Sequence, residues 1–86
     1  MKTYILTEKI MNGTVTLNII TTIFRSQSFK KIINKLKVEM SKLNEHRLIK
    51  FSIENDNEEK FSYNIEGEDY LLYGYILNKE QKIVTV

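Results

Sequence analysis

The stretch YLLYGYIL, residues 70–77, decides the fold. Successive side chains of a strand point to opposite faces of its sheet. Here both faces are apolar, which is typical of a strand at the centre of a sheet, covered on both sides. The sequence therefore predicts a central strand in this place. One face carries Leu71, Tyr73, Tyr75 and Leu77; the other carries Tyr70, Leu72 and Ile76, with Gly74 between them.

The first 24 residues predict a β-hairpin. Residues 3–11 are rich in strand-forming side chains, and Asn12-Gly13 follows. Both central positions of a type I′ turn need positive φ, which Asn and Gly tolerate best. The returning strand, residues 14–24, alternates with a period of two, so we expect one of its faces to be buried. That face carries Val15, Leu17, Ile19 and Ile23, with Thr21 among them.

Residues 28–43 predict an amphipathic helix packed on this sheet. Either Ser26 or Ser28 can cap its first turn, because a serine hydroxyl accepts a hydrogen bond from a free backbone N–H. Asn44 is the expected C-cap. The apolar side chains recur three or four residues apart, and burying each contributes about 1.5–3 kcal/mol before entropy. They are Phe29, Ile32, Ile33, Leu36, Met40 and Leu43.

After the helix the two-residue period returns, in 49–53 and 61–65, and KIVTV at 82–86 ends the chain. The predicted fold is α+β: an antiparallel sheet with one amphipathic helix packed on it, in the order β-β-α-β-β-β-β, as one domain over residues 1–86. One helix covers one face of such a sheet. The second apolar face therefore needs a curled sheet, a second copy of the chain or a foreign partner.

The composition indicates an AT-rich genome and a reducing compartment. Lys, Ile and Asn supply 31 of the 86 residues, while Ala, Pro, Trp and Cys are absent. The lack of cysteine fits a cytoplasmic location. No apolar run approaches the length that spans a bilayer, and no signal peptide is predicted.

The sequence predicts neither an enzyme nor a bound cofactor or metal. His46 is the one histidine and cysteine is absent, so the common nucleophile–base pairs cannot be built, apart from serine–lysine or carboxylate arrangements. Glycines 13, 67 and 74 stand apart, so no phosphate-binding loop is present. NDNEE, residues 55–59, lacks the glycine and the closing glutamate of a calcium loop.

Charge is segregated along the chain. Residues 25–50 carry a net +6 and residues 54–69 a net −6. We expect the acidic segment to form a partner-binding surface, because carboxylates beside tyrosines can occupy a basic groove on another protein. Its members are Glu58, Glu59, Tyr63, Glu66, Glu68, Asp69, Tyr70 and Tyr73.

The basic segment supports an alternative, a small nucleic-acid-binding protein whose helix contacts phosphates. The residues concerned are Arg25, Lys30, Lys31, Lys35, Lys42 and Arg47. Base stacking would need aromatic side chains among them, and the aromatic residues lie in the acidic half instead.

A resemblance adds to this interpretation. The Lys/Ile/Asn-rich composition, the clustered acids and the junction TTIFRSQSFKKIINKLK, residues 21–37, resemble small phage and mobile-element proteins, among them anti-CRISPR inhibitors. The resemblance implies a viral protein that inhibits or modulates a host defence or nucleic-acid-handling complex by protein–protein contact in the host cytoplasm. The remaining hypothesis is a homodimeric structural subunit.

Overall fold

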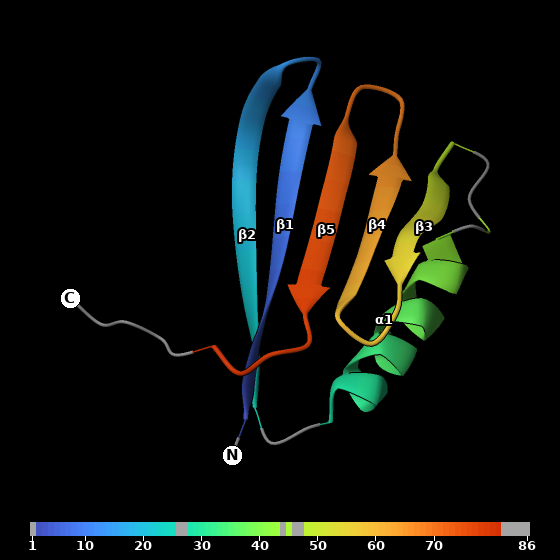
Figure 1. The fold of residues 1–86 in the computed structure, drawn as a ribbon. Coiled ribbons are helices and arrows are strands. Elements are labelled where there is room, and N and C mark those ends of the chain that lie inside the picture. The colour runs from blue at the N-terminus through green and yellow to red at the C-terminus, as the bar shows by residue number, and fades with distance from the viewer. Residues whose placement is uncertain (1, 26–27, 44, 46–47, 82–86) are drawn as a thin grey trace.

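Among the residues that the structure describes, five strands form one antiparallel sheet, and a helix packs on one of its faces (Figure 1). The computed structural model describes residues 2–25, 28–43, 45 and 48–81. The predicted α+β class is confirmed. The last predicted strand, at 82–86, lies outside the described residues. The elements are β1 (Thr3–Asn12), β2 (Val15–Arg25), α1 (Phe29–Leu43), β3 (Lys50–Asp56), β4 (Lys60–Glu66) and β5 (Leu71–Leu77).

The strand order in space is β2-β1-β5-β4-β3, so β5 lies at the centre, as its two apolar faces predict. β5 pairs antiparallel with β1 on one side and with β4 on the other. β2 and β3 form the two edges (Figure 1). The helix connects these edge strands in sequence and lies toward the β3 side of the sheet.

The helix begins where a serine caps it. The backbone N–H of Lys31 donates to the Ser28 hydroxyl at 3.2 Å, and that of Ile32 donates to the Ser28 carbonyl at 3.1 Å. Of the two predicted capping serines, Ser28 is therefore the N-cap; Ser26 and the predicted C-cap, Asn44, lie outside the described residues. The predicted apolar stripe is confirmed: Ile32, Ile33, Leu36 and Met40 are buried, and Phe29 and Leu43 are partly buried.

The core lies between this stripe and the facing side chains of β1, β4 and β5. Gly74 pairs with Tyr63 in the ladder, and the Tyr63 ring occupies the space above Gly74. A Cβ on Gly74 would clash with that ring. The missing side chain at the centre of β5 is therefore what admits a fully buried aromatic ring from β4. The strand residues of the core are Tyr4, Leu6, Phe61, Tyr63, Ile65 and Ile76.

Two features of the hairpin differ from the prediction. Asn12 pairs with Val15 inside the ladder, so the connecting residues are Gly13 and Thr14, with Gly13 at a φ of 61°. The turn is thus one residue later than predicted, and its positive φ still falls on glycine.

The face of β2 that was predicted to be buried is exposed. Ile19 and Ile23 retain 55% and 43% of their accessible surface, and Val15 and Leu17 retain more than half. The reason is the position of β2 at an edge, with α1 packed on the opposite face of the sheet toward β3. Periodicity indicates which residues share a face only where the ladder is regular, and the register shift near Met11 takes Val15 off the face of Ile19 and Ile23. Periodicity also does not indicate which face another element covers.

Candidate interaction surface

The sheet has one covered face and one face that no described helix or strand covers, which we call the open face. Side chains that lie opposite each other in the ladder point to the same face of the sheet, so the strand pairing shows to which face a paired residue points. Leu6, opposite Ile76, lies in the core beneath α1; Ile5 and Thr7, its neighbours on β1, therefore point to the open face.

Half of the open face is apolar. β2, β1 and β5 contribute aliphatic and tyrosine side chains in adjoining rows, such as Ile23 beside Ile5 and Met11 beside Leu71. Uncovered apolar surface of this kind is a common feature of interaction sites. The apolar side chains of this half, with Thr7, Lys9 and Thr21 among them, are Ile5, Met11, Ile19, Ile23, Leu71, Tyr73, Tyr75 and Leu77.

The other half of the open face, on β4 and β3, is polar and makes its own hydrogen bonds. The Asn55 amide donates to the Ser62 hydroxyl at 2.7 Å, and the Asn64 amide donates to the Glu54 carboxylate. Ser62 is fully buried beneath its neighbours. Polar groups that are already paired gain little from a partner, so binding energy would come from the apolar half.

The two tyrosines at the boundary carry most of the aromatic area. The Tyr73 and Tyr75 rings lie 5.9 Å apart, centroid to centroid, and both are half-buried. The Lys60 ammonium lies 5.7 Å above the Tyr75 ring, and Lys9 is opposite Tyr73 in the ladder. Tyrosine gives rigid contact area with a hydroxyl that can form hydrogen bonds, which suits an anchor at an interface.

An acidic turn borders the apolar half at one end of the sheet. We use this name for Glu66, Glu68 and Asp69, around the connection from β4 to β5. The Gly67 N–H donates to the Tyr70 carbonyl at 3.0 Å, and the Tyr70 ring lies over Gly67. The turn and the β1–β2 connection line one shallow hollow, so the carboxylates lie beside Met11 and Leu71.

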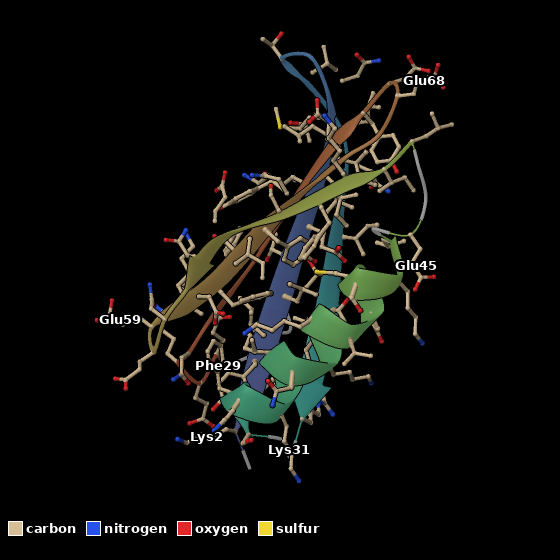
Figure 2. All side chains as sticks on the ribbon, turned by 90° about the vertical axis from the view of Figure 1, so that its right-hand side faces the viewer. Lys2, Phe29, Lys31, Glu45, Glu59 and Glu68 are labelled. Atoms are coloured by element: carbon tan, nitrogen blue, oxygen red, sulfur yellow. The ribbon has the colours of Figure 1, made fainter. Side chains whose placement is uncertain are left out.

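The structure brings together part of the predicted acidic surface. Glu66, Glu68, Asp69, Tyr70 and Tyr73 lie at this end of the sheet or on the adjoining open face. Glu58 and Glu59 lie at the opposite end of β4, as the separation of Glu59 from Glu68 shows (Figure 2). Their backbone carbonyls accept hydrogen bonds from Asn78, at 2.7 Å and 2.8 Å respectively.

Tyr63 does not belong to this surface, and its assignment as a partner contact is corrected. It points to the helix side of β4 and is fully buried. Its hydroxyl donates to the Glu8 carboxylate at 2.8 Å. Burial first, and then this hydrogen bond and the negative charge of Glu8, raise the pKa of Tyr63 well above its ordinary value. Tyr63 therefore acts as a neutral structural donor.

Glu8 also lines a groove of about 310 Å³ between α1 and β2. The walls are mainly apolar, with Lys35 and Glu39 of α1 beside Glu8. The Tyr63 hydroxyl lines the same groove and is held by its hydrogen bond to Glu8, so these polar groups offer charge and hydrogen bonds there.

The predicted basic residues do not form one uniform patch. Lys30 and Lys31 lie in the first turn of α1, and Lys35 and Lys42 follow along the helix. Arg25 ends β2, and Arg47 lies outside the described residues. The neighbouring Lys37 ammonium lies 2.6 Å from the Asp56 carboxylate. Lys30, Lys37, Asp56 and Glu58 line one hollow, so folding places acidic side chains among the basic ones.

Sequence reasoning missed the contribution of β1 and β2 to the surface. Ile5, Met11, Ile19 and Ile23 share the open face with Tyr73 and Tyr75 because β1 lies next to β5. The sequence does contain a signal for this larger surface. Apolar side chains recur at every second residue of β2, and β5 carries apolar residues on both of its faces. Together these supply more apolar faces than one helix can cover.

Within the described ranges, no helix is long and apolar enough to cross a membrane. The described residues also contain no group of three or more His, Cys, Asp or Glu side chains placed to hold a metal ion. No family model matches the chain, and neither the curated proteins nor the solved structures include a match.

Proposed function

We propose that this chain is a non-enzymatic binding protein that contacts another protein through the apolar half of its open face and the acidic turn. The observation that carries the proposal is the apolar half itself, which is left uncovered by the described elements. Burying aromatic and aliphatic side chains there would stabilise a complex, and hot spots of this kind commonly contribute about 2 kcal/mol or more each.

The acidic turn indicates the chemistry of the partner. Three carboxylates beside an apolar surface fit an apolar patch bordered by Lys or Arg. A nucleic-acid-binding groove on a host protein has such a border, because it is built to hold phosphates. Together with the composition, this supports the sharper form of the proposal: a cytoplasmic phage or mobile-element protein that inhibits a host defence or nucleic-acid-handling complex.

The test is affinity capture from a low-GC bacterial lysate with matched variants. Leu71→Thr with Tyr73→Thr removes apolar area while retaining strand-forming side chains. Val38→Thr is the control, since Val38 is 58% exposed on α1, away from the open face. We expect the double variant to bind a captured protein at least about tenfold more weakly, a difference of about 1.4 kcal/mol. The control should bind as the wild type does.

A second variant, the triple substitution Glu66→Ser, Glu68→Ser and Asp69→Ser, tests the acidic turn. It should weaken capture and reduce its dependence on salt, because screening acts on exposed charges. Equal capture by the wild type and both variants would contradict the proposal.

Nucleic acid is the alternative outcome of this experiment. Lys60 and Lys9 adjoin Tyr75 and Tyr73, so basic and aromatic side chains do meet on the open face. Stacking on such tyrosines would hold single strands with a strong dependence on salt. Loss of the captured material after nuclease treatment, with direct binding of an oligonucleotide at low salt, would replace the protein partner with a nucleic acid.

A further inference from the structure

The edge strand β2 has features that favour pairing with another strand. It is 11 residues long, and its outer side pairs with no described strand. From Thr14 to Phe24 the chain contains no charged residue and no proline. Edge strands normally carry charges, prolines, bulges or a covering element, because their free backbone groups otherwise pair with other chains.

The opposite edge shows these protective features. β3 carries Lys50, Glu54 and Asp56 within seven residues. Its register shifts between Ile53 and Asn55, and α1 lies beside it. β2 has a register shift near the hairpin connection, which leaves the ladder regular from Asn18 to Arg25. The two edges of the same sheet therefore differ, and β2 is the unprotected one.

We propose that β2 pairs antiparallel with β2 of a second copy, joining two sheets of five strands into one continuous sheet. A two-fold axis near the middle of β2 relates the copies, so each contributes the same segment. Backbone hydrogen bonds supply the attraction, as in other strand-addition complexes. Residues 15–24 of β2 are uncharged and bring no like charges together across the axis.

Charge at the two ends of β2 favours a second copy as the occupant. Lys2 and Arg25 lie at one end, where Thr3 pairs with Arg25. At the other end the β1–β2 connection shares a hollow with the acidic turn. Figure 2 shows Lys2 and Glu68 at opposite ends of the molecule. Antiparallel pairing places the basic end of each copy beside the acidic end of its partner, which is electrostatic complementarity.

The dimer would also enlarge the candidate interaction surface. A two-fold axis perpendicular to the sheet turns both open faces to the same side. Ile19 and Ile23 of each copy then meet at the join, and the two apolar halves form one surface with polar borders. The pairing itself rests on the edge of β2 and does not depend on the proposed binding function.

Sedimentation velocity of the full chain over a range of concentrations tests the proposal. We expect a reversible dimer for the wild type. Thr21→Lys places two like charges close to the axis and should raise the dimer dissociation constant at least about tenfold. Ser52→Lys makes the matched change at an exposed position on the open face of β3 and should leave the dimer unchanged.

Cysteine scanning keeps the test decisive if Thr21→Lys impairs folding. The chain contains no cysteine, so single substitutions from Asn18 to Thr22 report self-contact directly. Disulfide formation should be greatest at one position and fall on both sides of it. A monomer at all concentrations would overturn the proposal, as would a dimer that is cross-linked through Tyr73→Cys and not through β2. Sedimentation of the Leu71→Thr, Tyr73→Thr variant separates this result from the proposed function, since both substitutions lie on β5 and the variant should still dimerise.

Discussion

At the scale of single residues, the packing of Tyr63 on Gly74 explains how a small sheet holds a large aromatic ring. Tyr63 and Phe61 of β4 are both fully buried on the side of the sheet that α1 covers. Tyr63 finds room because Gly74 has no side chain. Neither partner can be enlarged without moving the other, since protein interiors are close-packed.

Gly74→Ala should therefore destabilise the fold. The new Cβ would meet the buried Tyr63 ring, and overpacking of this kind costs about 1–3 kcal/mol. Gly67→Ala is the control: its Cβ would meet the Tyr70 ring, which is 38% exposed and can rotate away. Its expected cost is about 0.5 kcal/mol or less. Urea denaturation of both variants measures the difference. Equal stability of the two would contradict the packing described here.

Tyr63→Phe should reveal the hydrogen bond to Glu8 and its dependence on pH. Near neutral pH we expect a loss of about 1 kcal/mol, because Glu8 loses its donor. The pKa of Tyr63 is raised in the folded chain, so the unfolded chain ionises first as pH rises. The stabilisation from Tyr63 is therefore present below pH 10 and is lost above it.

The stability difference between the wild type and Tyr63→Phe should then narrow as pH rises above 10. Denaturant midpoints measured from pH 7 to 11 give this difference directly. The variant retains the other tyrosines and all the lysines, so their titration affects both proteins alike. A difference that stays constant or widens would contradict the assigned role of Tyr63.

At the scale of elements, the helix is the part that the sequence predicts most completely. Its apolar stripe and its cap both follow from local rules: Ile32 and Leu36 fall on the buried face, and Ser28 accepts the N–H of Lys31. Local rules suffice because a helix makes its hydrogen bonds within its own segment. The faces of β2 could not be predicted in the same way, because they depend on where α1 packs.

Ser28→Ala should cost about 1 kcal/mol, since the first turn would lose the acceptor for the Lys31 N–H. Ser41→Ala is the control within the same helix. The Ser41 hydroxyl donates to the Val38 carbonyl at 2.8 Å on an exposed surface, and alanine is the better helix former. The control should be neutral or slightly stabilising. Thermal unfolding followed by circular dichroism distinguishes the two, and equal losses would argue against Ser28 as the cap.

At the scale of the whole molecule, the sequence predicts the fold class and the central place of β5, but not the spatial order of the strands. β5 lies between β1 and β4, so residues near both ends of the chain form one surface. Such long-range pairing leaves no local trace. The acidic surface was predicted as one piece, although β4, a locally predictable strand, separates Glu59 from Glu68 by its full length.

The proposed binding function depends most on the apolar half of the open face being accessible to solvent in the isolated chain. Isoleucines provide natural probes on both faces, and a soluble paramagnetic agent broadens the NMR signals of exposed methyl groups. In dilute solution, the methyls of Ile19 and Ile23 should be strongly broadened and those of Ile32 and Ile76 should be protected. If Ile19 and Ile23 were protected as fully as Ile32, the open face would be sealed within one copy and could not be the binding surface.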